Sequence, residues 1–433
     1  MLKAIFTDIR TIGGRAYIVG GYVRDMLLGV ESKDIDIEVY NITPKELEAI
    51  LKDYGEFRLV GKSYPIYLLG EYEFSFPQRV IDSGQKKRLI VDSTMSIEDA
   101  TLRRDLTINS MLYDPLENEI IDIYGGREDL KRGIISYVNR DTFQQDLLRI
   151  LRVAQFKARF EFEVDQGTEE LCKELIVKLQ GLAKERIFIE LEKILLKAKR
   201  PSLAFRWMKK VGILARLFSE IDQLSEIEQG QKYHPEGDVF EHTMLALDVL
   251  PLAERNIALM LAILYHDVGK AYVQVKRSGD RIHFYGHEQA GADKIGEFLN
   301  KITDNKQLIE EVKKLVKYHM RPLNLRKHLS KKAVRKLVTQ VDIPQLLKLH
   351  QADLLGRGLE VDLSYIDKIL EIYDKVKDEV KPIIMGRHLI NLGVEPGKRI
   401  GILLKEIYRA QLDGKFSDLA GGLEYTKNIL NLK

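Results

Sequence analysis

A pair of glycines followed by two closely spaced aspartates constrains this chain more than any other feature. An apolar stretch runs into Gly20 and Gly21, a short helical pattern follows, and a second apolar stretch then carries Asp34 and Asp36. Side chains of a strand alternate between its faces, so the two aspartates are expected on one face, where they repel each other unless a cation lies between them. The glycines let the backbone approach a triphosphate and present N–H donors. The combination predicts a two-metal site for nucleotidyl transfer, although Asp-x-Asp alone is also typical of two solvated acids.

Length and composition predict several globular domains. A chain of 433 residues, 45% hydrophobic and 31% charged, is too long for one core and indicates about two to four helix-rich domains. The single cysteine, Cys172, excludes an internal disulfide and fits a reducing cytosol, so a cytoplasmic location is expected. The longest apolar run, Ile257–Tyr265, is too short to span a bilayer, and no membrane association is expected. A net charge of +3 neither supports nor excludes a nucleic-acid partner.

Apolar periodicity divides the chain into a strand-rich part and a helical part. Over the first ~135 residues, strands interleaved with helices are expected at Ala16–Val19, Ile35–Tyr40, Ile66–Leu69, Tyr72–Phe76, Leu89–Asp92 and Ile120–Asp122. From Asp141 onward the pattern is almost wholly helical. The segment Gln229–Pro235, which contains Gly, His and Pro, indicates a linker. A histidine-bearing helical region then runs to about Arg357, before a smaller helical tail.

Two further segments add an acid and arginines to the strand-rich part. Glu73 lies on an expected strand, where an antiparallel neighbour could bring it beside Asp34 and Asp36 to complete a metal site or accept a proton. The alternative is an exposed glutamate paired with a lysine. In Leu102–Met111, adjacent arginines can clamp a triphosphate, and Asn109 can hydrogen-bond a ribose or phosphate. Such arginines are also common on helix surfaces, and their position after the acidic strands is what indicates a binding role.

A third segment suggests selection of a nucleobase. Asp146, Arg149 and Arg152 follow one another at three-residue spacing, so on a helix each neighbouring pair shares a face. Asp146 can accept from an exocyclic amine while Arg149 donates to a neighbouring ring acceptor. Cytosine and adenine both present an amine beside an acceptor, so this pair favours C and A over U and G. The alternative is an intrahelical salt bridge worth about 0.3 kcal/mol.

Histidines and aspartates in the C-terminal half form another set of candidates. His266-Asp267 follows the apolar run and precedes Val-Gly-Lys270. Imidazole and carboxylate ligands from separate helices can hold one or two divalent metal ions and leave a position for an activated water. A lone His-Asp is usually structural, but four of the nine histidines occur here in order. The candidate ligands are His242, His266, Asp267, His287, His319 and Asp353.

Six motifs in the N-terminal half, read in order, resemble the class II tRNA nucleotidyltransferase and bacterial poly(A) polymerase family. The resemblance covers roughly residues 14–220 and is carried by Val19–Asp25, Lys33–Ile37, Arg103–Asn109, Asp122–Leu130, Gln145–Arg149 and Lys184–Leu191. It implies that Asp34 and Asp36 bind Mg²⁺ and that Glu73 is the third catalytic acid. It also implies that Asp146 and Arg149 act as an amino-acid template. The expected nucleotide-binding residues are Gly20, Gly21, Arg24, Arg104, Asp105, Asn109, Asp146, Arg149 and Arg152.

Three features bear on the activity that this resemblance implies. The family's template motif usually begins with Glu, and here Gln145 keeps the hydrogen bond but loses the charge. Enzymes of the family that add only CC have a shortened loop, whereas Arg79–Val91 has full length. Poly(A) polymerases of the family usually carry a strongly basic extension, whereas this tail is nearly neutral. These features favour CCA addition and leave A-only addition open.

The histidine pattern resembles the HD phosphohydrolase superfamily, in which such histidines, the His-Asp doublet and a late Asp are metal ligands. The resemblance implies a phosphatase or 2′,3′-cyclic phosphodiesterase, with a capacity for two metal ions. A divalent transition metal is compatible with the ligands. The expected multidomain fold has an α/β (α+β), polymerase-beta-like nucleotidyltransferase head, an all-α neck and body, an α-helical HD domain and a helical tail. Their expected bounds are 1–138, 139–228, 229–358 and 359–433.

The combined expectation is a template-independent, CCA-adding tRNA nucleotidyltransferase that uses CTP and ATP. An A-adding enzyme or a poly(A) polymerase is one alternative. An HD phosphohydrolase with a degenerate RNA-binding N-terminal domain is another. The expected partner is tRNA, gripped by the helical body and tail, and an oligomer is compatible with the sequence. Candidate phosphate contacts, which could equally belong to a solvated helix face, are Arg326, Lys331, Lys332 and Arg335.

Overall fold

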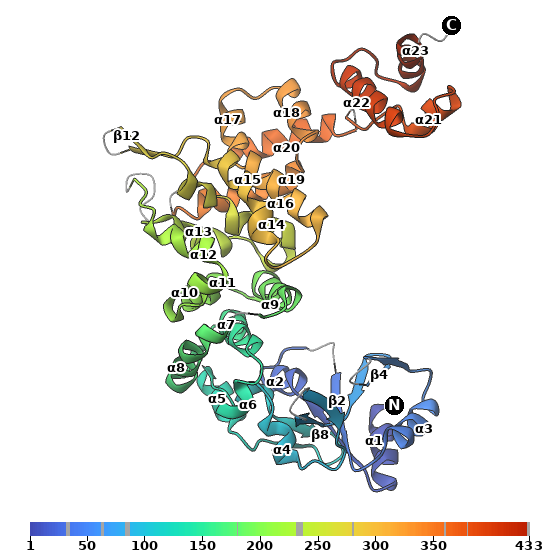
Figure 1. Ribbon diagram of the computed structural model, residues 1–433, viewed down its shortest axis with the longest axis vertical. Coiled ribbons are helices and arrows are strands. Elements are labelled where there is room, and N and C mark those ends of the chain that lie inside the picture. The colour runs from blue at the N-terminus through green and yellow to red at the C-terminus, as the bar shows by residue number, and fades with distance from the viewer. Residues whose placement is uncertain are drawn as a thin grey trace. The chain divides into compact units, whose positions relative to one another are not determined.

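Strands and helices are distributed over two compact units. The computed structural model describes residues 1–31, 35–61, 65–82, 87–179, 181–230, 237–278, 281–358, 361–378 and 380–430 (Figure 1). The units are Met1–Leu217, which holds most of the strands, and Phe218–Lys433, which is almost wholly helical. Within the described ranges, no helix combines the length and the apolar character needed to cross a bilayer.

The first unit is built on a seven-stranded sheet with the spatial order β3-β4-β5-β2-β1-β8-β9. Neighbouring strands are antiparallel except for β2 and β5, which are parallel. The last four residues of both β1 and β2 are buried, as expected for central strands. The strands are β1 (Arg15–Val19), β2 (Ile35–Tyr40), β3 (Arg58–Val60), β4 (Ile66–Leu69), β5 (Tyr72–Ser75), β8 (Leu112–Asp114) and β9 (Glu119–Ile121).

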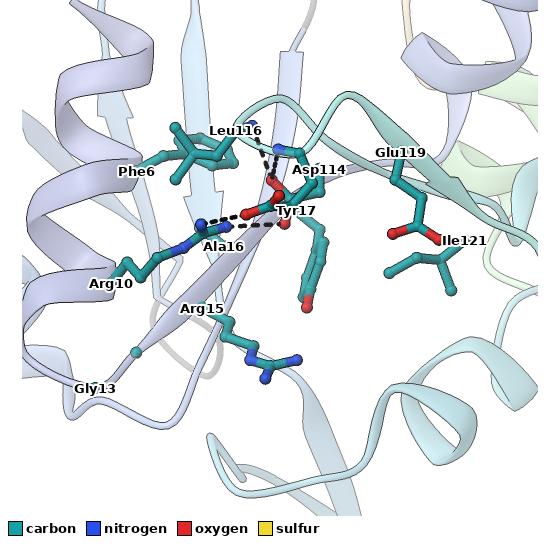
Figure 2. Close-up of a pocket in the computed structure, with 12 residues that line it drawn as sticks. Phe6, Arg10, Gly13, Arg15, Ala16, Tyr17, Asp114, Leu116, Glu119 and Ile121 are labelled. Atoms are coloured by element: carbon teal, nitrogen blue, oxygen red, sulfur yellow. Dashed lines mark hydrogen bonds and ion pairs between the residues drawn. The ribbon is translucent and has the colours of Figure 1, made fainter.

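Short amphipathic helices surround this sheet. Thr43 and Glu46 form a capping box at the start of α3, with mutual hydrogen bonds between side chain and backbone. Arg10 of α1 donates to Asp114 of β8 at 3.2 Å, which ties the helix to the sheet beside a pocket at the start of β1 (Figure 2). The helices are α1 (Leu2–Thr11), α2 (Gly21–Leu27), α3 (Pro44–Lys52), α4 (Ile97–Leu102), η1 (Thr107–Asn109) and α5 (Gly126–Arg132).

The rest of the first unit is mainly helical. α7 packs against α9 and α10 through an apolar face. Cys172 of α8 is fully buried, and burial raises the pKa of its thiol to about 12. The helices are α6 (Arg140–Phe143), α7 (Leu148–Phe160), α8 (Gln166–Leu175), η2 (Ile176–Lys178), α9 (Lys184–Lys197), α10 (Ser202–Val211) and α11 (Ile213–Leu217). Two small strand pairs complete the unit, β6 (Gln78–Asp82) with β7 (Lys87–Val91) and β10 (Ile134–Ile135) with β11 (Glu163–Val164).

The second unit is organised around α14, which is buried along all of its length except Ile257. A helix that is apolar all round belongs in a core, and α14 packs against α13, α16 and α19. The first elements are α12 (Ser219–Asp222), η3 (Gln223–Glu226), α13 (Val239–Leu247), η4 (Leu252–Glu254), α14 (Ile257–Tyr265), η5 (Val268–Tyr272), β12 (Lys276–Ser278) and β13 (Arg281–His283). The helices that follow are α15 (His287–Leu299), α16 (Lys306–Tyr318), α17 (Arg321–Lys327), α18 (Lys331–Val338), α19 (Ile343–Leu355) and α20 (Ser364–Val376).

The last three helices enclose a small core of their own around Leu389, Ile407 and Phe416. They are α21 (Gly386–Asn391), α22 (Lys398–Leu412) and α23 (Leu419–Ile429). The chain therefore ends in a helical tail, as the sequence predicts.

The predicted class, an α/β first part followed by helices, is confirmed. Two predicted strands are displaced by one or two residues, since β7 occupies Lys87–Val91 and β9 occupies Glu119–Ile121. The expected antiparallel neighbour of Glu73 was wrong for the acidic strand, because β5 runs parallel to β2. β3 was missed because all three of its residues are exposed, which leaves no apolar alternation to detect.

Candidate functional site

The turn between β1 and α2 requires glycine. Gly20 has a φ of +69°, in the left-handed region that side chains disfavour. A Cβ on Gly20 would lie 3.6 Å from the Arg104 guanidinium, and a Cβ on Gly21 would lie 3.4 Å from that of Arg24. The missing side chains therefore leave the turn open toward two arginines.

Two of the three expected carboxylates are neighbours. Asp36 of β2 and Glu73 of β5 are register partners in the parallel pair, so their side chains project from the same face of the sheet. Asp36 is exposed and Glu73 is half-buried. Asp34 lies outside the described residues, and its position beside Asp36 stays a prediction.

Asp36 opens onto a cleft of about 520 Å³ within the first unit. The cleft gathers the predicted residues Gly20, Gly21, Arg24, Asp36, Arg104, Asp105, Asn109 and Arg152. The predicted residues Glu73, Asp146 and Arg149 do not belong to its described lining.

Three basic residues in the cleft were not singled out from the sequence. They are Arg159 of α7 and Lys193 and Lys197 of α9. Arg159 follows Arg152 by two helical turns, and the two lysines are one turn apart, so each pair lies on one helix face. That spacing was a usable signal, but the packing of α7 against α9 cannot be read from local periodicity.

Arg24 is a buried member of the cleft wall. Its guanidinium pairs with Asp25 at 2.7 Å, donates to Oδ1 of Asn109 at 2.5 Å, and lies over the rings of Phe156 and Phe160. Burial lowers the pKa of Arg24, and Asp25 opposes that shift. The Arg24 side chain is therefore placed to hold Asn109 in position, because its guanidinium is already engaged by these partners.

Asp105 connects this group to α7. Its carboxylate accepts from Asn109 Nδ2 at 3.1 Å, from the Leu106 backbone N–H at 2.8 Å, and from Arg152 Nε. Burial alone would raise the pKa of Asp105, but the Arg152 charge and these hydrogen bonds hold it below its usual value. Asp105 therefore stays ionised and fixes both Asn109 and Arg152.

Arg104 presents a second guanidinium to the cleft, next to the glycine turn. It pairs with Glu38 at 3.2 Å, and Glu38 also accepts from the Tyr40 hydroxyl at 2.6 Å. Its side chain keeps 27% exposure, so part of the guanidinium remains accessible to a ligand.

Asp146 and Arg149 do not form the intrahelical pair that was considered as an alternative. Asp146 precedes α7, which begins at Leu148, and pairs with Arg186 of α9 at 2.7 Å. The Arg149 guanidinium donates to the backbone carbonyls of Thr142 at 2.8 Å and of Arg103. Each residue thus has a partner elsewhere, and the expectation that both lie on one helix face was wrong because the helix starts later.

In the second unit, all six predicted ligands converge. His242 (α13), His266 and Asp267 (end of α14) form one group, and Asp267, His287 (α15) and His319 (end of α16) form a second that shares Asp267. Asp353 of α19 adjoins the first group, with its carboxylate 3.2 Å from His242 Nε2. Nε2 of His287 lies 3.2 Å from that of His319, and Nε2 of His266 lies 3.3 Å from that of His242. Five separate helices therefore deliver these side chains to one place.

The imidazoles are oriented for binding through Nε2. Nδ1 of His266 contacts the Ile263 carbonyl at 2.8 Å, and His287 and His319 make the same contact with the carbonyls of Phe284 and Val316. A carbonyl only accepts, so each Nδ1 carries the proton and each Nε2 lone pair faces the cluster. Three imidazoles oriented in this way, together with His242 and two carboxylates, fit a divalent transition metal.

The cluster is buried, and the charge states of its side chains are set by burial and by the neighbouring charges. Burial would raise the pKa of Asp267, but Lys270 and His266 lower it well below its usual range. Burial together with the neighbouring His287 and His266 lowers the pKa of His319 to about 3. Asp267 is therefore anionic and His319 neutral at ordinary pH, which are the forms that ligate metals.

A cavity of about 400 Å³ reaches this cluster. Asp267, His287 and Asp353 lie on its wall with two cations, Lys270 and Arg357. Lys270 donates to Asp267 at 2.7 Å and Arg357 donates to Asp353 at 2.8 Å. Lys270 closes the sequence that follows His266-Asp267, but the sequence alone assigned neither cation a role.

The candidate phosphate contacts in the second unit have mixed surroundings. Arg326 pairs with Asp362 at 3.3 Å and lies over the Tyr365 ring. Lys331, Lys332 and Arg335 of α18 line a groove of about 900 Å³ that also includes Arg409 of α22. The groove is basic, and its role stays a prediction.

Three family models match successive parts of the chain. The poly A polymerase head domain matches residues 16–136. The family described as "Probable RNA and SrmB-binding site of polymerase A" matches residues 161–224, and the HD domain matches residues 239–357.

The chain is similar to proteins named Multifunctional CCA protein. The one from Haemophilus influenzae (strain PittGG) is 39% identical over 293 residues, which cover 64% of this chain and 68% of the relative. The one from Acinetobacter baumannii (strain SDF) is 31% identical over 409 residues, which cover 88% and 96%.

Solved structures share the fold. The Bacillus stearothermophilus CCA-adding enzyme in complex with CTP superposes with a TM-score of 0.67 at 19% identity, over 99% of this chain and 97% of that one. The Thermotoga maritima CCA-adding enzyme complexed with tRNA gives 0.57 at 24% identity, over 99% and 94%.

Proposed function

This chain belongs to the multifunctional CCA protein family, and we propose that it adds C, C and A to tRNA 3′ ends from CTP and ATP without a nucleic-acid template. The observation that carries the proposal is the register of β2 against β5, which pairs Asp36 with Glu73 near the Gly20 turn. Adjacent carboxylates at a cleft rich in arginine suit in-line transfer of a nucleotidyl group to a hydroxyl.

In the proposed reaction, the terminal tRNA hydroxyl attacks the α-phosphate and pyrophosphate leaves. Mg²⁺, which Asp34 and Asp36 would hold, supplies neutralisation of the phosphate charge when bound. Glu73, beside Asp36, is the third acid, able to complete this site or to accept the hydroxyl proton. Arg104 and the backbone N–H of Gly21 hold the triphosphate, since a guanidinium and N–H groups bind phosphate oxygens. The N–H of Gly20 itself donates to the Met111 carbonyl.

The buried polar group behind the cleft positions the sugar. Asn109 is the member proposed to bind the ribose or phosphate, and its amide is fixed from both ends by Arg24 and Asp105. Arg152 completes this group through Asp105. A fixed amide loses little entropy when a ligand binds, so the group favours a single ligand geometry.

Asp146 and Arg149 are proposed to select C and A. Their present partners, Arg186 and backbone carbonyls, would have to be exchanged for base edges when a nucleotide binds. Gln145 is exposed beside them, where it can still hydrogen-bond to a neighbour.

The histidine cluster is proposed to be a phosphohydrolase site, a phosphatase or 2′,3′-cyclic phosphodiesterase. A divalent transition metal held by these ligands supplies an activated water when bound. In a monoesterase reaction, the water oxygen bonds to phosphorus, the phosphorus–oxygen bond to the sugar breaks, and a proton passes to the leaving hydroxyl. Lys270 and Arg357 are placed to bind phosphate oxygens, because both cations lie on the cavity wall.

The family matches also support the proposed division into head (1–138), neck and body (139–228), HD domain (229–358) and tail (359–433). The helical body and tail are proposed to grip the tRNA, and the basic groove at Lys331, Lys332 and Arg335 is one candidate surface.

The deciding experiment sequences product ends after incubation of the protein with Mg²⁺, CTP and ATP. The substrates are tRNAs that lack A, CA or CCA. Completion of all three to CCA supports the proposal. Extension only of the tRNA that lacks A would identify an A-adding enzyme, and long A tails would identify a poly(A) polymerase. Absence of any incorporation by the intact protein would overturn the proposal.

A further inference from the structure

Three consecutive aromatic residues lead from β13 into α15. The rings of His283 and Tyr285 are stacked, with centroids 5.2 Å apart and an interplanar angle of 12°. Lys270 Nζ lies 5.5 Å from the centroid of the Phe284 ring between them. Tyr285 remains 67% exposed although it is a large aromatic residue. The exposed ring needs an explanation, because most tyrosines bury more of their surface.

This aromatic pair is attached directly to the proposed metal site. His283, Tyr285, Asp267 and His287 lie on the wall of the same cavity of about 400 Å³. The Phe284 carbonyl contacts His287 Nδ1 at 2.8 Å and accepts from the His287 backbone N–H at 3.3 Å. The segment that carries the stacked rings therefore also orients a ligand, which fixes the position of the rings relative to the cluster.

Three cations lie near the rings or on the cavity wall. Lys276 of β12 pairs in register with His283, and its Nζ lies 5.9 Å from the Tyr285 centroid. Lys270 and Arg357 lie on the wall of the same cavity. A flat exposed ring close to cations is an arrangement with which proteins hold nucleotides, because any base can stack on an aromatic face.

We propose that Tyr285, backed by His283, is a stacking platform for the nucleobase of a nucleotide whose terminal phosphate enters the histidine cluster. The proposal rests on the proposed phosphohydrolase function and adds the residues that would bind the base of its substrate, a nucleotide that is free or at an RNA 3′ end. The cavity volume falls in the range of small-ligand sites. Because stacking is tolerant of sequence, the platform accepts all four bases.

The test compares phosphate release from guanosine 2′-monophosphate and from glycerol 2-phosphate, which has no ring, with Mn²⁺, Co²⁺ or Ni²⁺ present. The variants are Tyr285→Ala and the matched control Tyr285→Phe, which keeps the flat ring. For Tyr285→Ala we expect KM for the nucleotide to rise about 10-fold with kcat unchanged, within the range of one lost stacking contact. The ratio of kcat/KM for nucleotide over glycerol phosphate should fall by the same factor, whereas Tyr285→Phe should keep the wild-type ratio.

An unchanged ratio in Tyr285→Ala would overturn the platform, and so would an equal loss in Tyr285→Phe or a fall in kcat with both substrates. If the wild-type protein hydrolyses neither compound, the phosphohydrolase proposal fails. The platform is then decided by equilibrium dialysis of guanosine 2′-monophosphate. Guanine is used because the proposed base selection of the first unit disfavours it. Weaker binding by Tyr285→Ala than by Tyr285→Phe supports the platform, and equal binding refutes it. A dinucleotide with a 3′-terminal phosphate, run in parallel, separates RNA ends from free nucleotides.

Discussion

Gly269 lies two residues after Asp267 at a point where two backbones touch. A Cβ at this position would lie 1.9 Å from the His287 carbonyl oxygen and 2.5 Å from the Gly291 backbone nitrogen. We expect Gly269→Ala to push α15 away and to cost at least about 1–3 kcal/mol of unfolding free energy, as overpacking does. Because α15 begins with His287, the variant should also retain less metal after gel filtration, measured by elemental analysis.

The matched control is Gly296→Ala in the same helix, where no atom lies within 4 Å of the added Cβ. Alanine favours the helix over glycine, so this variant should be more stable by up to about 1 kcal/mol and should keep its metal. Wild-type stability and metal content in Gly269→Ala would contradict the close approach.

The grouping of side chains in space was predictable where their chemistry is rare and shared by their partners. Histidines and the His-Asp doublet identified the cluster, although the ligands come from five helices. Arg24 shows the opposite case. Its spacing indicated a place at the nucleotide site, but its partner Asn109 is 85 residues away, and the rings that cover it belong to α7. Burial and distant partners could not be predicted from local sequence.

The start of α7 is joined to α9 through the ion pair of Asp146 with Arg186. Two explanations for the proposed selection of C and A can therefore be separated: Asp146 reads the base, or the ion pair positions the two helices. If Asp146 reads the base, Asp146→Ala should raise UTP and GTP incorporation relative to CTP and ATP by about 10-fold or more, the value of one lost base contact. Arg186→Ala removes the same ion pair but leaves Asp146 in place, so it should keep the wild-type selectivity. Single-turnover incorporation of each nucleotide measures both. Equal relaxation in the two variants would assign the effect to the link between the helices.

α19 contains a histidine that should make folding of the second unit depend on pH. His350 is buried against the Tyr365 hydroxyl, and burial lowers its pKa to about 4. The unfolded chain binds a proton below about pH 6.5, while the folded chain stays neutral to about pH 4. Stability is therefore complete above pH 6.5 and falls as the pH drops through this window. The loss that His350 contributes between pH 7 and pH 5 is about 2 kcal/mol. His319, whose pKa is lowered to about 3, adds a further loss of the same sign.

Urea unfolding at both pH values measures this loss. The glutamine of His350→Gln cannot titrate but can still hydrogen-bond to Tyr365. The loss of stability from pH 7 to pH 5 should therefore be smaller in this variant than in the wild-type protein, by about 2 kcal/mol. A variant with the same pH dependence as the wild-type protein would show that His350 is not the group responsible.

Elements with a clear period were predictable, and their pairing was not. β1 and β2 were located by apolar runs, and α14 by its continuous apolar sequence. The parallel pairing of β2 with β5 sets Asp36 opposite Glu73, but the sequence gives no direction for strands joined through intervening elements. The expectation that Glu73 lies beside Asp36 was therefore correct, but the antiparallel pairing from which it was argued was wrong.

Each compact unit contains one candidate site, since the cleft at Asp36 lies in the first unit and the histidine cluster lies in the second. A substitution in one site should therefore abolish the activity of that unit and leave the activity of the other unit intact. We expect Asp36→Ala to lower CTP and ATP incorporation by at least about 10³-fold, because it removes a carboxylate of the proposed Mg²⁺ site. Its rate of phosphate release from nucleoside monophosphates should remain that of the wild-type protein.

The reciprocal variant is His266→Ala, which removes a buried ligand and should abolish phosphate release while tRNA extension continues. Circular dichroism melting of both variants shows whether each unit is still folded. Normal incorporation by Asp36→Ala would refute the metal assignment in the first unit. Absence of incorporation by the wild-type protein would instead favour a phosphohydrolase with a degenerate RNA-binding domain. Loss of both activities in either folded variant would mean that the two sites depend on each other. The contacts described within each unit predict no such dependence.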